Sequence, residues 1–389
     1  MREAVVVNVV RTPVGKMGQS LAKIKAAKLG ALAINEAVKR SKIAPEEIDE
    51  VMFCNLFNVD AGNMARLAWL EAGLPVSVPA ISLDRQCSSS LNAMAYASIL
   101  INSGNADVVL TGGVESYSQS PLMIARPEKA CPNELKFIIK ACSTEEIGNP
   151  PMIVTAENIA MKYKLTREEC DEFALRSHVL ASESWREGKF KEQVFSVTIP
   201  QKRGNAIVVD MDDCVRSDCS MQGLAKLRPI VKPDGVVTAG NSSPMNDGAS
   251  ASNLMEKQKA LSLGLKPLVK IKAFASAGCD PNLMGLGPVY STRKLLNKTG
   301  LKINDIDLIE INEAFASQTL ACVKELGIDI TRLNVNGGSI SIGHPNAASG
   351  CIVGGRLIYE MIARGSKYGL VTFCCGGGQG FSVLFESVK

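Results

Sequence analysis

The feature that most limits the fold of this chain is an internal repeat. Residues 41–55 comprise a turn, an acidic helical turn opened by Pro45, an Ile-Asp pair and a strand-like run, and residues 300–312 follow the same order. Residues 107–113 and 368–377 form a second matching pair, each a strand that runs into glycines. The copies lie roughly 260 residues apart, far beyond the period of a solenoid, and both pairs occur in the same order. The chain is therefore predicted to contain a duplicated domain.

Strand-like and helix-like periods alternate along the chain. Residues 4–10 form a Val-rich run typical of a buried strand, and residues 25–39 place their apolar side chains on one stripe of an amphipathic helix. This alternation predicts an α/β fold in which helices cover sheets. With 389 residues, of which 46% are hydrophobic and 21% charged, the chain is long and apolar enough for two to three domains.

Residues 116–236 differ from both copies. They contain frequent Pro and Gly, a basic stretch at 201–204, and a helix start at Thr166, which Glu169 completes as a capping box. We interpret this segment as a loop domain inserted in the first copy and as a candidate substrate-binding lobe. The predicted domains are residues 1–115 with 237–265, residues 116–236, and residues 266–389.

Charge and cysteine content exclude several classes of protein. A net charge of +4 is small for this length and argues against a nucleic-acid-binding protein. No apolar run approaches the ~18 residues of a membrane span, and the start shows no secretory leader. The twelve cysteines contain no C-x-x-C pair, so neither a metal site nor a disulfide framework is expected. Many free thiols fit a cytoplasmic location.

Cys87 is the first candidate for chemistry. It lies between a strand-like run at 79–83 and an Ala-rich helix at 91–100, so its sulfur is expected at a helix N-terminus. The positive end of a helix lowers a thiol pKa and favours the nucleophilic thiolate. A buried cysteine beside serine caps explains this segment equally well.

His344 is the second candidate and one of only two histidines. It lies in a Gly-rich loop, between Gly343 and Pro345, where a ligand can approach the backbone closely. A histidine there can take a proton from a thiol or donate to an oxyanion, although a structural loop histidine is the alternative. The other, His178, falls within a helical pattern, where a surface or packing role is expected.

Two further segments end strands. Cys374 and Cys375 precede three glycines, whose free backbone N–H groups can point at an oxyanion. The pair is alternatively redox-active or merely buried. Asn312 directly follows the strand of the second repeat copy, where its amide can hold a water or a carbonyl oxygen, or simply cap a helix.

Taken together, these segments resemble the thiolase family over nearly the whole chain and in the family's order. The matching stretches are Arg11-Thr-Pro, Cys87-Ser-Ser-Ser-Leu91, Gly112-Gly-Val-Glu-Ser116, Thr155-Ala-Glu-Asn158, Ala225-Lys-Leu-Arg-Pro229, Thr238-Ala-Gly-Asn241, Asn246-Asp-Gly-Ala249, Asn312-Glu-Ala-Phe-Ala316, Gly343-His-Pro345 and Cys374-Cys-Gly-Gly-Gly378. The resemblance implies two duplicated βαβαβαββ halves in a layered α-β-α-β-α core, with the loop domain inserted in the first half.

The resemblance also implies a mechanism. Cys87 is similar to the nucleophile that becomes acylated, and Cys374 to the acid/base cysteine. By the same resemblance His344 activates Cys87 and, with a water held by Asn312, forms an oxyanion hole for the enolate. The backbone N–H groups of Cys87 and Gly376 form a second hole. Acyl transfer through a covalent thioester replaces one difficult step by two easier ones.

For the substrate, the resemblance implies coenzyme A and acyl-CoA, with no permanently bound cofactor. Arg216 takes the place of an arginine that contacts adenine, and Ser243 that of a serine that contacts pantetheine. Assembly as a homodimer or homotetramer is expected, with an accessory subunit as an additional alternative.

Several positions depart from the family pattern, and they face the acyl and pantetheine groups. They are Pro151-Met-Ile153 for His-Met-Gly, Gln222-Gly223 for Asp-Ser, Pro244 for a glycine, Asn346-Ala347 for a hydrophobic residue and glycine, Ser90 for a glycine, and Tyr117 for a methionine. We therefore expect a catabolic thiolase for a bulkier or functionalised 3-oxoacyl-CoA. The alternatives are an acetoacetyl-CoA thiolase, a noncatalytic or partner-dependent acyl-CoA-binding relative, a decarboxylating ketoacyl synthase and, least favoured, a redox protein.

Overall fold

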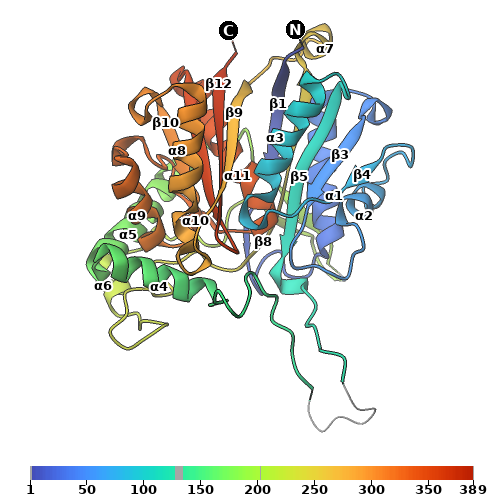
Figure 1. Cartoon of the computed structure of the whole chain (residues 1–389). Coiled ribbons are helices and arrows are strands. Elements are labelled where there is room, and N and C mark those ends of the chain that lie inside the picture. Colours follow the sequence, from blue (N-terminus) through green and yellow to red (C-terminus); the bar gives the residue numbers. More distant parts are fainter. Residues whose placement is uncertain (1, 128–134, 202, 389) are drawn as a thin grey trace.

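The computed structural model of the chain describes residues 2–127, 135–201 and 203–388 (Figure 1). The strands are β1 (Ala4–Arg11), β2 (Gly15–Lys16), β3 (Glu50–Cys54), β4 (Ala80–Ile81), β5 (Val108–Ser116), β6 (Val197–Ile199), β7 (Ile207–Val209), β8 (Asn246–Glu256), β9 (Val269–Gly278), β10 (Leu308–Ile311), β11 (Tyr368–Cys375) and β12 (Gln379–Ser387). The helices are α1 (Ala26–Ser41), α2 (Met64–Glu71), α3 (Ser89–Asn102), α4 (Met152–Tyr163), α5 (Arg167–Arg186), α6 (Met221–Ala225), α7 (Lys257–Ser262), α8 (Gly287–Thr299), α9 (Ala316–Leu326), α10 (Ser339–Ile342) and α11 (Ser349–Arg364).

The internal repeat is confirmed by equivalent hydrogen bonds in the two halves. β3 pairs in parallel with β5, and β10 pairs in parallel with β11. In the first half the Asp49 carboxylate accepts the N–H groups of Asp107 and Val108 at 2.7 and 3.0 Å. In the second half the Asp307 carboxylate accepts those of Lys367 and Tyr368, both at 2.8 Å. The Ile-Asp pair is therefore repeated because its aspartate fixes the start of the neighbouring parallel strand.

The strands of the two halves meet along β1 and β9. Within the described residues they form one ten-stranded sheet in the order β10-β11-β12-β9-β1-β8-β5-β3-β4, with β2 added to β8. The link between the halves is short, since β1 and β9 share only the pairs Val5–Lys270 and Val6–Val269. The two halves are therefore joined at the middle of this mixed sheet by two residue pairs only.

Helices lie in three layers around these strands. α1 and α2 cover the outer face of the first half, and α8 and α9 cover that of the second half, at opposite sides of Figure 1. α3 and α11 pack against each other and share a buried core with strands of both halves. This is the expected α-β-α-β-α order, and it carries the start of α3, and Cys87 just before it, into the middle of the molecule.

The segment between the halves contains α4, α5, α6 and the β6–β7 ribbon. The capping box that starts α5 is confirmed, because Thr166 accepts from the N–H of Glu169 and its own N–H donates to the Glu169 carboxylate. The strand expected at 79–83 is shorter, because β4 is the sheet's edge strand and pairs with β3 at two residues only. Residues 128–134 and 202 of this segment lie outside the described residues, and its exact boundaries stay predictions. Among the described residues, no helix is both long and apolar enough to cross a membrane.

Candidate active site

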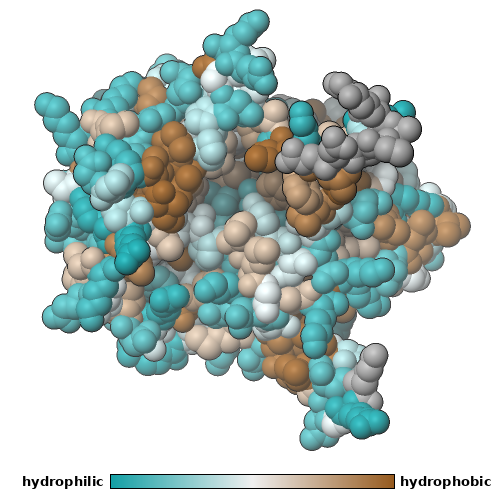
Figure 2. Space-filling model, turned by 90° about the horizontal axis from the view of Figure 1, so that it is seen from below, coloured by the Kyte–Doolittle hydropathy of each residue, from teal (hydrophilic) through white to brown (hydrophobic). Residues whose placement is uncertain are grey.

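The carboxyl ends of β10 and β11 lie at the bottom of Figure 1, opposite the two termini, and border a cavity of about 770 Å³. Seen from below, the molecule is hollowed near its centre, with hydrophobic patches beside the hollow (Figure 2). Cys87, His344 and Cys374 all line this cavity, although they are far apart in the sequence. The fold therefore brings together three of the side chains singled out in the sequence.

Cys87 lies half-buried in a short 3-10 turn, Gln86–Ser88, immediately before α3. Gln86 has a positive φ of 50°, a conformation that non-glycine residues adopt rarely and mainly where the surrounding structure requires it. Burial raises the pKa of the Cys87 thiol, as do the neighbouring Cys375 and Cys142, while backbone N–H groups of Gly376 and Cys87 itself lower it. The pKa of Cys87 is therefore raised, and not lowered as expected from the helix end, because burial is the largest effect on it.

Cys374 and Cys375 end β11 and point to different surroundings. Cys374 lines the cavity, and burial, with Cys87 nearby, raises the pKa of its thiol. The Cys375 sulfur instead contacts Ser88 Oγ at 3.1 Å, and burial raises its pKa to about 11. In the turn that follows, the carbonyl oxygen of Cys142 lies 2.5 Å from where a Cβ on Gly377 would stand. The turn therefore requires glycine for close packing.

His344 is buried and fixed by three hydrogen bonds. Its backbone N–H donates to Asn246, its Nδ1 lies 2.6 Å from Ser349 Oγ, and its Nε2 lies 3.4 Å from Asn312 Nδ2. Because Ser339 donates to Asn312 Oδ1 at 2.6 Å, the Asn312 amide N–H₂ faces the imidazole. This pattern assigns the proton to Nδ1 and leaves Nε2 as the acceptor. Burial lowers the pKa of His344 to about 4, so the ring is neutral at neutral pH.

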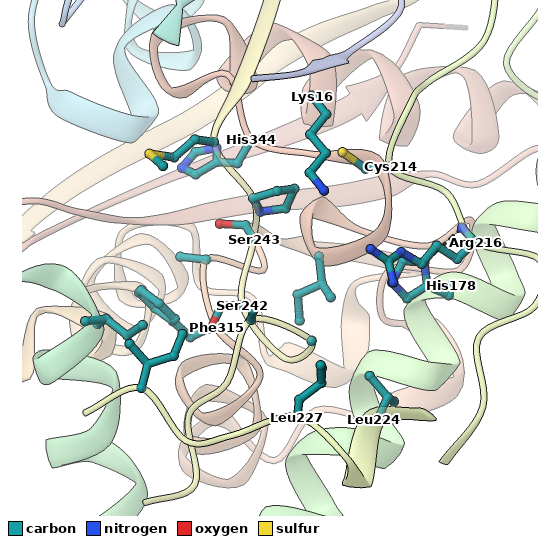
Figure 3. A pocket seen from close by; sticks show the side chains of 18 of the residues that line it. Lys16, His178, Cys214, Arg216, Leu224, Leu227, Ser242, Ser243, Phe315 and His344 are labelled. Atoms are coloured by element: carbon teal, nitrogen blue, oxygen red, sulfur yellow. Dashed lines mark hydrogen bonds between the residues drawn. The ribbon is translucent and has the colours of Figure 1, made fainter. Parts of the chain in front are cut away.

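The outer part of the cavity carries cations and apolar side chains. Lys16 and the exposed Arg216 extend into it from different segments, and Leu224 and Leu227 line another part (Figure 3). Ser243 lies between these groups and the catalytic end, with its N–H bonded to Ala314 O at 3.0 Å. An elongated ligand with an anionic end matches this arrangement.

Sequence reasoning missed several groups around the site. Ser349 and Ser339, which orient His344 and Asn312, begin the helices on either side of the His344 loop. Because both are close to His344 in the sequence, they could have been predicted from its neighbours. Asn346 was noted only as a departure, yet its amide nitrogen lies 3.6 Å from the Cys87 sulfur. His178, for which a surface or packing role was expected, is buried and accepts the backbone N–H of Arg216 at Nδ1, and it also lines the cavity (Figure 3).

Comparison with known proteins decides the family. Residues 4–258 match the family described as "Thiolase, N-terminal domain", and residues 265–387 match "Thiolase, C-terminal domain". The chain belongs to the thiolase family. This thiolase is an acyltransferase that acts on CoA thioesters.

Its relatives include proteins named acetyl-CoA acetyltransferase, beta-ketothiolase and 3-ketoacyl-CoA thiolase. The thiolase is 44% identical over 389 residues to the acetyl-CoA acetyltransferase of Chromobacterium violaceum, with 99% of each chain covered. It is 41% identical to the 3-ketoacyl-CoA thiolase of Bacillus subtilis, over 99% of this chain and all of that relative. The crystal structure of the Bacillus anthracis acetyl-CoA acetyltransferase has a TM-score of 0.94 and 38% identity, over 100% of this chain and 99% of that one.

Proposed function

We propose that this thiolase cleaves, in a catabolic direction, a 3-oxoacyl-CoA that is bulkier or more functionalised than acetoacetyl-CoA. The observation that carries this proposal is where the departures from the family pattern lie. Six of these positions line the cavity, namely Tyr117, Met152, Ile153, Gly223, Pro244 and Asn346. Because they change the shape and polarity of the wall while the catalytic groups are kept, they alter which acyl group fits.

The proposed chemistry has two half-reactions. His344 takes the proton of Cys87, and the thiolate attacks the C3 carbonyl carbon of the substrate. The C2–C3 bond then breaks, its electron pair forms the enolate of acetyl-CoA, and Cys374 protonates that enolate. In the second half-reaction Cys374 removes the proton of the incoming CoA thiol, the CoA sulfur attacks the acyl-cysteine, and Cys87 leaves as the thiolate.

We propose two oxyanion holes for these steps. Once His344 Nε2 has taken the proton of Cys87, it can donate to the enolate oxygen together with a water held by Asn312, whose amide nitrogen lies 3.4 Å from Nε2. For the tetrahedral intermediate, the donors are the backbone N–H groups of Cys87 and Gly376, both of which already act on the Cys87 sulfur. These roles support acyl transfer without a bound cofactor, with CoA as the substrate.

For CoA we propose contacts along the outer cavity. Arg216 is exposed at its rim and suits the adenine and phosphate end, whereas Ser243 lies nearer the catalytic groups and suits pantetheine. Lys16 extends into the same space and adds a second cation for the anionic end of CoA (Figure 3).

A second candidate is an acetoacetyl-CoA thiolase, because several relatives near 40% identity are named acetyl-CoA acetyltransferases. A thiolysis assay separates the two. Loss of 3-oxoacyl-CoA absorbance on adding CoA is followed for wild type and Cys87→Ala with acetoacetyl-CoA and with longer, branched and aryl 3-oxoacyl-CoAs. We expect a bulkier substrate to give the higher kcat/KM, and a clear preference for acetoacetyl-CoA contradicts the proposal. No turnover by a folded protein that binds CoA indicates a partner-dependent or noncatalytic relative.

We also propose that the protein assembles as a homodimer or homotetramer in the cytoplasm. The edge strand β4 lies near exposed apolar side chains, among them Val76, which is 75% exposed. A second apolar surface includes Ile124 and Phe137, which form an isolated antiparallel bridge and are both exposed. The eleven described cysteines are free, as a reducing compartment requires. Light scattering during size exclusion measures the assembly, and a monomer at micromolar concentration contradicts it.

A further inference from the structure

The loop after His344 places a polar side chain against the candidate nucleophile. Asn346 begins a short 3-10 turn, Asn346–Ala348, and lines the same cavity as Cys87. Its Nδ2 lies 3.6 Å from Cys87 Sγ, within the range of a hydrogen bond to sulfur. Among the residues that the structure describes, it is the side chain that donates to this sulfur.

Tyr117 fixes which way the Asn346 amide points. The Tyr117 hydroxyl donates to Asn346 Oδ1 at 3.2 Å, and its ring packs on Phe57 with the ring centroids 4.8 Å apart. With the oxygen occupied by this hydroxyl, the amide nitrogen is turned toward the sulfur. The reversed amide would place a carbonyl oxygen against a thiolate and repel it, so the chemistry of a charged sulfur selects the observed orientation.

The backbone of the loop is held independently of these side chains. The buried Glu115 carboxylate accepts the N–H of Ala347 at 3.3 Å, and Ser250 Oγ donates to Ala348 O at 2.7 Å. The Asn346 side chain is therefore carried on a fixed loop, and its contact with the sulfur does not depend on loop movement.

We propose that Asn346 is a catalytic residue, whose side-chain amide donates a hydrogen bond to the sulfur of Cys87 and stabilises the thiolate. Tyr117 is a positioning residue that holds this amide in place. The inference rests on the proposed role of Cys87 as nucleophile. An amide suits the task because it is neutral, cannot take the proton itself, and favours the charged form of the sulfur by hydrogen bonding.

The surroundings of Cys87 explain why such a donor is needed. The sulfur lies in a partly desolvated site, and the titratable groups near it are Cys374 and Cys375 from β11, Cys142 and Tyr117. All four are neutral acids that become anions when they lose a proton, so the positive charge nearest the thiolate is the His344 imidazolium formed when His344 takes the proton of Cys87. Before that transfer His344 is neutral, so the sulfur is stabilised by dipoles, namely backbone N–H groups and the Asn346 amide.

The test measures the reactivity of the Cys87 thiolate directly in the full chain. Iodoacetamide alkylation is followed between about pH 6 and about pH 10, and peptide mass spectrometry resolves which cysteine reacts. Asn346→Leu keeps the approximate size of the side chain but removes the donor. Tyr117→Phe removes only the hydroxyl, and Tyr163→Phe removes a hydroxyl that bonds Glu325 instead, as the matched control.

We expect Asn346→Leu to slow alkylation of Cys87 on the order of 10-fold at a fixed pH and to move its profile to higher pH. Tyr117→Phe should shift the profile in the same direction by less, and Tyr163→Phe should leave it unchanged. Wild-type alkylation of Cys87 in a folded Asn346→Leu protein overturns the inference. If that variant does not fold, an unchanged profile in Tyr117→Phe overturns it. Thiolysis that persists in Cys87→Ala would instead refute the proposed nucleophile, independently of the alkylation result.

Discussion

Gly350 permits a close approach between the two helices of the central layer. It lies in the first turn of α11, and a Cβ added there would stand 2.1 Å from the backbone nitrogen of Leu91 in α3. Real Cβ contacts are essentially never shorter than 3.0 Å, so Gly350→Ala forces the two helices apart by nearly 1 Å. The obstacle is backbone rather than a flexible side chain, which leaves few ways to relax.

The magnitude follows from two opposing terms. Overpacking a well-packed core costs about 1–3 kcal/mol, and the upper part applies because backbone must move. Replacing glycine by alanine within a helix stabilises the folded state by about 0.5–1 kcal/mol. We therefore expect Gly350→Ala to lower the free energy of unfolding by about 2 kcal/mol. Since Cys87 immediately precedes α3, a shift of this size should also reduce kcat on the order of 10²-fold.

Gly354 provides a matched control one turn later on α11. A Cβ there would lie 3.8 Å from Met94 Sδ and 3.9 Å from Leu91 Cδ1, which are ordinary contacts. Gly354→Ala should therefore raise the free energy of unfolding by about 0.5–1 kcal/mol and leave kcat unchanged. Urea unfolding and thiolysis kinetics measure both quantities. Equal stability of the two variants, or a more stable Gly350→Ala, would refute the packing argument.

Three further predictions follow from other parts of the structure. Arg11→Met leaves the buried Asp212 without its ion-pair partner, so urea unfolding should show a loss of about 3–5 kcal/mol, against less than about 1 kcal/mol for Lys28→Met in an exposed pair. Burial and, to a lesser degree, Arg216 lower the pKa of His178 to about 4. As pH falls below about 6.5, this histidine binds a proton in the unfolded chain but not in the folded one, so the free energy of unfolding decreases. Between pH 6.5 and pH 5, the free energy of unfolding of His178→Gln should fall by roughly 2 kcal/mol less than that of wild type, and identical pH profiles would contradict this. Glu115, whose pKa burial raises to about 7, changes the free energy of unfolding in the opposite direction, but equally in both proteins. Arg216→Ala should raise KM for CoA with little change in kcat, while Lys226→Ala, an exposed change outside the cavity lining, should alter neither.

Local patterns were enough to predict much of the fold. The repeat at 41–55 and 300–312 is visible because its aspartates, Asp49 and Asp307, perform the same strand-starting task in each half. The capping box at Thr166 is equally local, since both partners lie within one helical turn. Such features depend on neighbours in sequence, so the sequence alone shows them.

Contacts between distant residues could not be predicted in this way. Asn346 and Cys87 are 259 positions apart, and the Tyr117–Asn346 bond spans 229 positions. The same limit explains the wrong expectation for the Cys87 pKa, because burial depends on segments from both halves. The ion-pair role of Arg11, which spans 201 positions to Asp212, was likewise hidden within a family motif.

Covalent acylation of Cys87 is the central claim, and one experiment tests it most directly. The protein is mixed with acetyl-CoA in the absence of a second substrate, quenched in acid and analysed by intact-protein and peptide mass spectrometry. The account predicts one acetyl group per chain, carried by the peptide that contains Cys87 and absent from Cys87→Ala. An acetyl group on Cys374 or Cys142 instead, or thiolysis that continues in Cys87→Ala, would contradict it.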